Sequence, residues 1–271
     1  MANCDGNCEH CSVEGCGERI VKSKPNEFSN IKRIIGVLSG KGGVGKSFVT
    51  SSIAAYLNRN GFKVGILDAD ITGPSIPKAF GVKEKAYGEN GLIYPCKTAG
   101  GIEVMSANLL LEDEKEPIIW RGPLLGNLVK QFFEQVMWGE LDVLLIDMPP
   151  GTGDVALTTF QSLPIDDLII VTSPQDLVSL IVTKAIKMAE MMNIHVLGVV
   201  ENMSYLVCPI CEEKIPLFGE SHLEEFAKEM KFNILGKLPL NSDNTALMDK
   251  GEIEKISLPE MQSIIDAIKG E

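Results

Sequence analysis

The sequence predicts an α/β fold with a mostly parallel, doubly wound sheet. From Ile31 onward, short aliphatic runs alternate with longer amphipathic segments. Such alternation is typical of parallel strands that are buried on both faces by helices. A further indication is a glycine-rich segment between an aliphatic run and a helical pattern. The expected strands are residues 33–38, 63–68, 103–106, 143–147, 168–172, 196–201 and 233–235.

Helices are predicted where apolar residues recur at a period of about 3.6. Residues 47–57 read as a helix, and the periodicity is clear in residues 124–136 and 177–188. A capped terminal helix is expected after residues 257–260, with one buried stripe on residues 261–268. A membrane-targeting helix would have a basic polar face, whereas the polar face of this helix is not basic.

Residues 40–47 read Gly-Lys-Gly-Gly-Val-Gly-Lys-Ser, which is a complete phosphate-binding loop. Its glycines let backbone N–H groups turn toward a β-phosphate, Lys46 neutralises phosphate oxygens, and the Ser47 hydroxyl is a ligand for Mg²⁺. The loop precedes a predicted helix, whose N-terminus favours anions. We therefore expect a P-loop NTPase fold, with nucleotide bound by Gly40, Lys41, Gly42, Gly43, Val44, Gly45, Lys46 and Ser47. The alternative is a chance glycine-rich turn.

Aspartates follow two of the predicted strands. Ligands of an open parallel sheet gather at the carboxyl ends of its strands. Asp147 comes after four aliphatic residues and is the expected second contact to hydrated Mg²⁺. Asp68 and Asp70 are candidates for positioning the attacking water or the metal shell, and spacing does not divide these roles between them. Helix N-capping is the alternative for Asp70 and Asp154.

Composition restricts the partners. A net charge of −12 and a pI near 4.8 disfavour nucleic acid and anionic membranes, which bind Lys/Arg patches. No run is long enough to span a bilayer, and the first residues lack the pattern of a signal peptide. We expect a cytoplasmic protein, with a cysteine-rich metal-binding tail at residues 1–30 and an ATPase domain at residues 31–271.

In a reducing compartment, closely spaced cysteines indicate metal or redox chemistry. Cys208 and Cys211, in the order Cys-Pro-Ile-Cys, supply two thiolates, whereas a [4Fe–4S] cluster takes four. A two-fold axis can supply the other two, because it brings the same residues from both chains together. Bridged Zn²⁺ and a thioredoxin-like redox pair are alternatives. The hairpin-like setting disfavours a redox pair, which normally follows a strand and opens a helix.

A second cysteine group lies at the N-terminus and is a full ligand set within one chain: Cys4, Cys8, Cys11 and Cys16. An iron–sulfur cluster, zinc and unligated thiols are the possibilities, and His10 is a competing ligand. Cys96 has no neighbouring partner in sequence and is assigned no function.

Seven segments together resemble the Mrp/Nbp35/ApbC family of iron–sulfur cluster carrier ATPases. They are residues 40–47, 67–75, 120–123, 138–142, 147–154, 201–204 and 208–211, and the match runs from about Ile31 to Leu240. The resemblance implies a homodimer that binds ATP and Mg²⁺, carries a [4Fe–4S] cluster between its subunits and delivers it to apoproteins. It also implies that Lys41 crosses to the partner's phosphates, that Asn202 bonds adenine and that Pro239 lies beside the base. Nbp35-type members of the family carry an N-terminal extension whose four cysteines hold a cluster. Their first two cysteines are more widely spaced in sequence than Cys4 and Cys8 are.

Two other functions share some of these features. A spatial-organiser ATPase, with zinc on the cysteines, would share the loop, Asp68 and Asp147 but would need a basic terminal helix or a DNA-binding surface. An electron-transfer reductase would bridge a cluster from two well-separated cysteines. The sequence favours the carrier.

Overall fold

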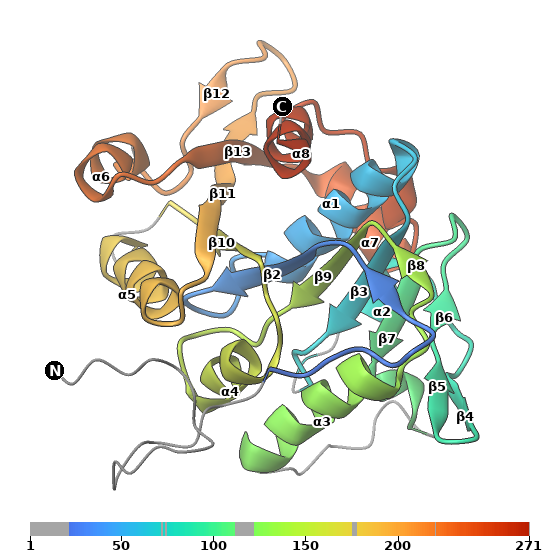
Figure 1. Cartoon of the computed structure of the whole chain (residues 1–271). Helices are drawn as coiled ribbons and strands as arrows, with labels where there is room; N and C mark the ends of the chain where they lie inside the picture. The colour runs from blue at the N-terminus through green and yellow to red at the C-terminus, as the bar shows by residue number, and fades with distance from the viewer. Residues whose placement is uncertain are drawn as a thin grey trace, which may run out of the picture.

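The structure is a computed structural model that describes residues 22–71, 73, 75–111, 122–174, 178–219 and 221–270, with backbone alone for residues 122–125, 154–155 and 178–179. Its central feature is a nine-stranded sheet formed by these residues, in the order β12-β11-β10-β2-β9-β3-β7-β6, with β13 beside β11 (Figure 1). All neighbours pair in parallel except β12 with β11 and β6 with β7. The expected doubly wound α/β fold is confirmed.

The strands of this sheet are β2 (Ile34–Ser39), β3 (Val64–Asp68), β6 (Cys96–Lys97), β7 (Glu103–Ser106), β9 (Val143–Asp147), β10 (Asp167–Thr172), β11 (His195–Val207), β12 (Lys214–Ile215) and β13 (Ile234–Leu240). Two small pairs stand apart from it: β1 (Asn30–Ile31) with β8 (Glu140–Leu141), and β4 (Tyr87–Glu89) with β5 (Leu92–Tyr94). The helices are α1 (Lys46–Arg59), α2 (Ile76–Ala79), α3 (Gly122–Gln135), α4 (Asp154–Ser162), α5 (Val178–Met191), α6 (Leu223–Met230), α7 (Ser242–Lys250) and α8 (Met261–Lys269).

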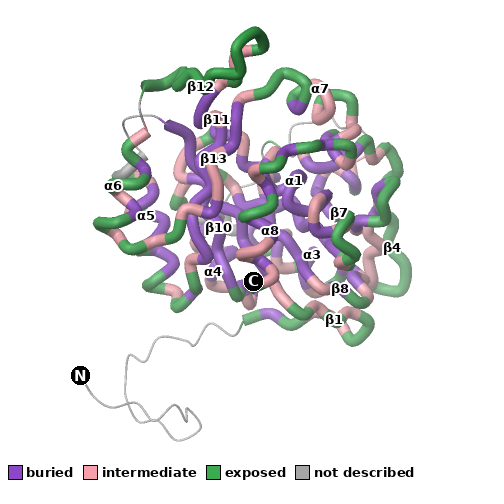
Figure 2. The backbone as a smooth tube through the Cα atoms, turned by 90° about the horizontal axis from the view of Figure 1, so that it is seen from above, coloured by how far each residue is buried: buried purple, intermediate pink, exposed green. Residues whose placement is uncertain are grey.

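Each face of the sheet has its own apolar core, because successive strand residues point to opposite faces. Ile35 and Val37 of β2 pack with residues of α1 and α8, such as Ile53 and Ile264. Ile34 and Leu38 of the same strand belong to the opposite core. That second core also contains Phe132 of α3, Phe160 of α4 and Val182 of α5. Seen from above, the central strands are buried and the segment around β12 is exposed (Figure 2).

Strand ends agree with the sequence in the middle of the sheet and differ at one edge. Residues 103–106 and 143–147 form strands with the expected bounds. β11 and β13 were expected to end at Glu201 and Leu235 but continue to Val207 and Leu240. Beyond Glu201, β11 leaves β10, continues the pairing with β13 that begins at Val199, and adds β12 as a new partner. This extension carries the chain from the sheet to the Cys-Pro-Ile-Cys segment.

The terminal helix α8 forms as predicted, and its start is capped by backbone groups and not by a side chain. Its N-cap residue, Glu260, makes no capping hydrogen bond with its side chain. The first N–H groups are satisfied by the backbone instead, since Met261 donates to the Leu258 carbonyl and Gln262 to the Pro259 carbonyl. A backbone turn therefore begins this helix.

Residues 22–30 lie against the domain. The Ser23 N–H donates to the Ser162 carbonyl at 2.7 Å, and Asn26 Nδ2 donates to the carbonyls of Glu134 and Val136 at 3.0 and 2.7 Å. The domain boundary after residue 30 stays a prediction. Within the part of the chain that the structure describes, no helix has the length and apolar character needed to cross a membrane.

Two glycines bring α2 and α7 together beside the phosphate-binding loop. Gly251, which ends α7, has φ +74°, and a Cβ built on it would lie 2.5 Å from Gly81 Cα. Gly270, which ends α8, has φ +79° and open space around the same position. Gly251 and Gly270 share the left-handed backbone, but only Gly251 makes a close contact. Substitutions at these two positions therefore separate the free-energy cost of the backbone conformation from that of the contact with Gly81.

Gly251→Ala should destabilise the protein more than Gly270→Ala does. We expect a loss of about 3 kcal/mol at position 251, from backbone strain plus overpacking, and about 1 kcal/mol at position 270 from strain alone. Urea unfolding followed by circular dichroism measures both values. Equal losses would show that the close approach of α2 and α7 does not constrain the fold.

Candidate nucleotide site

The phosphate-binding loop connects β2 to α1. Gly45, the N-cap of α1, has φ +79° and makes no side-chain capping bond, so the first N–H groups of the helix are left for a ligand. A Cβ on Gly45 would lie 2.2 Å from Asn202 Nδ2, and a Cβ on Gly40 would lie 1.4 Å from Ile181 Cγ2. Gly40 is therefore favoured for space, and Gly45 for its left-handed backbone. A helix N-terminus of this kind binds phosphate.

A buried carboxylate organises the cation end of the site. Asp147 is fully buried at the end of β9, and its Oδ2 accepts a hydrogen bond from Ser47 Oγ at 2.5 Å and lies 2.8 Å from Lys46 Nζ. Its Oδ1 accepts from Thr50 Oγ1 at 2.7 Å. Lys46 is itself only 6% exposed and also faces Asp70, 3.8 Å from Oδ2. The predicted magnesium ligands thus lie together in the structure.

Asp68 lies directly beside Asp147, because the two residues are paired across β3 and β9. Burial, and then the charge of Asp147, raise the pKa of Asp68 to about 8. One of its oxygens, Oδ2, is buried and has no hydrogen-bond partner within the described residues. The other accepts a weak bond from the Asp70 N–H at 3.2 Å. An unpartnered carboxylate oxygen beside Asp147, which itself bonds Ser47, fits a site for a hard cation such as Mg²⁺.

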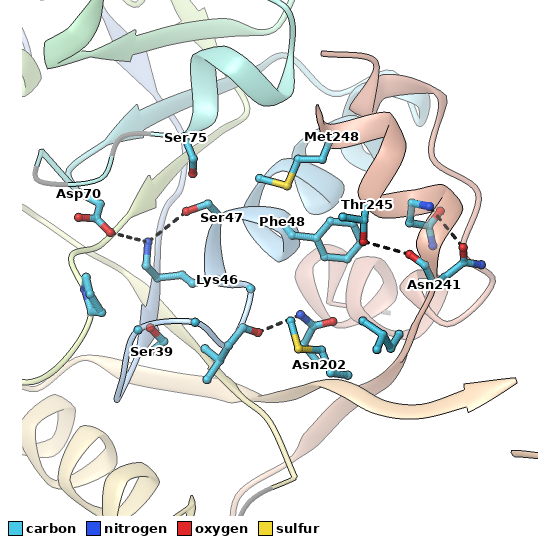
Figure 3. A pocket seen from close by; sticks show the side chains of 18 of the residues that line it. Ser39, Lys46, Ser47, Phe48, Asp70, Ser75, Asn202, Asn241, Thr245 and Met248 are labelled. Atoms are coloured by element: carbon cyan, nitrogen blue, oxygen red, sulfur yellow. Dashed lines mark hydrogen bonds and ion pairs between the residues drawn. The ribbon is translucent and has the colours of Figure 1, made fainter. Parts of the chain in front are cut away.

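A cavity of about 320 Å³ extends from this cluster toward α7. Figure 3 shows Lys46, Ser47 and Asp70 at one end and Asn241, Thr245 and Met248 at the other. Residues 42–47, Asp70, Asn202 and Pro239 were predicted for the site, and all line this cavity. Asn202 Nδ2 donates to the Val44 carbonyl at 2.9 Å. The cavity therefore joins a phosphate-binding end to a less polar end of suitable character for a base.

Several lining residues were not anticipated from the sequence. They come from α1, β13 and α7: Phe48, Leu240, Asn241, Asn244, Thr245 and Met248. Asn241 is the N-cap of α7, and its side chain accepts from the N–H groups of Asp243 and Asn244. An Asn at this position is a sequence signal for the start of a helix. That signal does not reveal that α7 lies over the loop. Lys41 precedes the lining residues and is partly buried, and its carbonyl accepts from Ser39 Oγ at 3.0 Å.

Cys208 and Cys211 lie in the turn between β11 and β12, which pair in antiparallel register from Leu206–Ile215 to Val207–Lys214. The hairpin setting expected from the sequence is confirmed. The backbone N–H groups of Cys211 and Ile210 lower the pKa of the Cys208 thiol, which favours the thiolate needed for metal binding. No group of three or more metal-binding side chains occurs within the described residues. Cys4, Cys8, Cys11 and Cys16 lie outside those residues.

Comparison with known proteins decides the family. Residues 30–269 match the family described as ParA: NUBPL iron-transfer P-loop NTPase. The chain belongs to this family. Proteins named iron–sulfur cluster carrier protein are similar to it. One from Clostridium perfringens is 46% identical, and the match covers 92% of this chain and 94% of the relative. One from Methanocaldococcus jannaschii is 48% identical, and the match covers 93% of this chain and 90% of the relative.

Solved structures agree. A nucleotide-binding protein from Archaeoglobus fulgidus, in complex with ADP, has a TM-score of 0.76 and 44% identity over 85% of this chain and 90% of that one. The cell division ATPase MinD of Pyrococcus furiosus has a TM-score of 0.64 at 21% identity, over 88% of this chain and 99% of its own, and shows the fold alone. The predicted P-loop ATPase is confirmed at the level of the family. The expected cofactors ATP, Mg²⁺ and an iron–sulfur cluster agree with membership of this iron-transfer family, and the spatial-organiser alternative is not favoured.

The raised pKa of Asp68 has a consequence for stability. A group whose pKa rises from 3.8 to about 8 on folding binds its proton more tightly in the folded protein. Folding is therefore favoured while this carboxyl is protonated, and the contribution is lost as the pH rises from about 4 to about 8. Ionised Asp68 is then a buried charge beside Asp147, which Lys46 and the Asp70 N–H compensate only in part.

Asp68→Asn should stabilise the nucleotide-free protein at high pH. The free energy of unfolding should exceed the wild-type value by more than about 1 kcal/mol near pH 8, and the difference should shrink by about pH 5, since one unit of pKa corresponds to about 1.4 kcal/mol. Urea unfolding at several pH values measures this. A difference that stays constant with pH would contradict the assignment.

Proposed function

We propose that this chain is an ATP-hydrolysing carrier that binds a [4Fe–4S] cluster at a homodimer interface and transfers it to apoproteins. The observation that carries the proposal is that β11 joins the two parts of the site. Asn202 of β11 lines the nucleotide cavity, and Cys208 and Cys211 stand at the exposed end of the same strand. Relatives of similar length bear the name iron–sulfur cluster carrier protein.

Ligand counting supports the dimer. The hairpin supplies two thiolates, whereas a [4Fe–4S] cluster takes four, and a two-fold axis at the hairpin completes the set. Exposed apolar side chains surround the cysteines, a feature that marks protein contact surfaces. Ile210, between the two cysteines, is 93% exposed. The others are Val207, Ile215, Leu217 and Phe218. A second hairpin packed against this one would cover them.

The chain's own residues account for nucleotide binding. The N–H groups at the start of α1 and Lys46 hold phosphate, and the apolar end of the cavity holds the base beside Asn202 and Pro239. Ser47 and Asp147 would hold Mg²⁺, which neutralises charge on the phosphates during transfer. Asp68 and Asp70 are placed to position the attacking water or the metal shell, and Lys41 is proposed to reach the partner's phosphates.

Two further parts of the proposal concern the N-terminal cysteines, which lie outside the described residues, and the cellular compartment. Cys4, Cys8, Cys11 and Cys16 are proposed to hold a second cluster in each chain, with zinc as the alternative. The carrier is proposed to act in the cytoplasm, where its thiols stay reduced.

Iron content tests the proposal. An anaerobically reconstituted dimer should contain about twelve irons, with about four at the hairpins and about eight in the two tails. Changing Cys208 and Cys211 to Ala should leave about eight irons and weaken the cluster-dependent dimer, because the tail sites are complete within one chain. Iron and sulfide analysis with native mass spectrometry gives both results.

Deletion of the first twenty residues is the reciprocal control and should leave about four irons. Cys96→Ala is a matched cysteine control and should leave iron content unchanged, because Cys96 is buried away from the hairpin. If the Cys208/Cys211 variant still delivers cluster to an apoprotein at the wild-type rate, the carrier mechanism is wrong. Zinc in the reconstituted tail would overturn the N-terminal cluster.

Lys41→Ala should lower ATP turnover by about a thousandfold and abolish ATP-stabilised dimerisation, since a cation supplied in trans contributes that much to phosphoryl transfer. Binding of a fluorescent ADP analogue to one subunit should persist. Steady-state turnover and light scattering with ATP measure these effects, and the exposed Lys83→Ala is the control. Unchanged turnover in the Lys41 variant would indicate an active site complete within one chain.

A further inference from the structure

Two successive residues of β11 face different parts of the molecule. Asn202 Nδ2 donates to the Val44 carbonyl of the phosphate-binding loop at 2.9 Å. Glu201 Oε1 accepts from Ser221 Oγ at 2.5 Å, and its Oε2 accepts from Ser204 Oγ. One residue thus contacts the nucleotide site, and the other contacts the segments that lead into and out of the cysteine hairpin.

The Glu201 carboxylate closes the base of that hairpin. Ser204 precedes residues 208–215 and Ser221 follows them, so one carboxylate connects the two sides. Glu201 is 1% exposed, and a buried carboxylate persists only when donors compensate its charge. The two hydroxyls do so, with Lys237 Nζ at 3.8 Å. We call Glu201, Ser204 and Ser221 the hairpin clamp.

The backbone between the clamp and the nucleotide cavity is irregular. Glu201 pairs with Lys237 and Tyr205 pairs with Pro239, so the register between β11 and β13 shifts at this point. Met203, in the middle of the shift, has φ +57°, a conformation that side-chain-bearing residues rarely adopt. Met203 and Asn202 both line the nucleotide cavity. Strain of this kind is maintained by surrounding contacts and is common where a segment must change conformation.

We propose that Glu201 is a positioning residue that couples nucleotide occupancy to the conformation of the cysteine hairpin. A nucleotide base in the cavity contacts Asn202 and Met203 and shifts the irregular segment. Glu201 and Ser204 flank that segment, so its movement changes the clamp and with it the two sides of the hairpin. This inference rests on the proposed function for its purpose, since the hairpin holds the cluster-binding cysteines, but the coupling itself needs no cluster.

Hydrogen exchange of the full-length protein tests the coupling directly. In the wild type, MgADP or MgATP should change the exchange rates of hairpin amides in residues 205–219 by at least about fivefold, in the range of typical coupling between sites. Ser221→Ala and Glu201→Gln should abolish this difference while the nucleotide Kd stays within about twofold. Ser221→Thr keeps the hydroxyl and should restore it.

Glu224→Gln is the matched control. Glu224 pairs with Lys237 at 2.6 Å but does not bond the clamp hydroxyls, so its variant should respond to nucleotide as the wild type does. A hairpin that does not respond in the wild type, or a full response in Ser221→Ala and Glu201→Gln, would overturn the proposal.

Cluster transfer, measured separately with and without MgATP, distinguishes the two hypotheses. Transfer by a wild type whose hairpin does not respond would refute the coupling alone. A responsive hairpin on a protein that carries no cluster would refute the carrier function alone.

Discussion

The buried carboxylate of Asp147 is the constraint on which the nucleotide site depends. It ends the central strand β9 with no exposure to solvent and holds Lys46, Ser47 and Thr50 of α1. A charge in this position is stable only while those donors surround it, so it fixes the first turn of α1 against the sheet. The same contacts position Lys46 and Ser47, the two groups proposed to bind phosphate and metal. The loop is therefore organised before ligand arrives, at the cost of crowding Asp68 against a second carboxylate.

Much of the sheet could be predicted because its strands are continuous aliphatic runs buried on both faces. Residues 143–147 are an example, since each of them is buried and the strand ends at the aspartate that sequence reasoning selected. The extensions of β11 and β13 could not be predicted in that way. Residues 202–207 and 236–240 contain Asn, Ser, Lys and Pro, and they become strands by pairing with each other and with β12 after β10 has ended. Tertiary pairing, not local pattern, determines those segments.

The nucleotide site likewise has one part that local sequence predicts and another that depends on tertiary contacts. The phosphate end is readable because one octapeptide supplies its glycines, its lysine and its hydroxyl. The opposite end is assembled from β13 and α7, which are adjacent in sequence, together with Phe48 and Asn202, which lie far from them in sequence and meet them only in the folded protein. The resemblance to a known family identified Asn202 and Pro239, whereas Thr245 and Met248 carry no local signal. Their position depends on the contact of Gly81 with Gly251, which holds α7 beside α2.

Division ATPases share this fold at low identity, so the sheet and loop alone do not specify iron chemistry. The proposed carrier function depends on the continuation of β11 past the end of β10 into an exposed hairpin. That continuation has a physical cost, because it leaves Ile210 and its apolar neighbours in solvent and buries the Glu201 carboxylate at the base. In the proposed dimer, a second hairpin would offset both costs by covering the apolar side chains and completing the thiolate set, and the proposed clamp would let the nucleotide site control how the two hairpins meet.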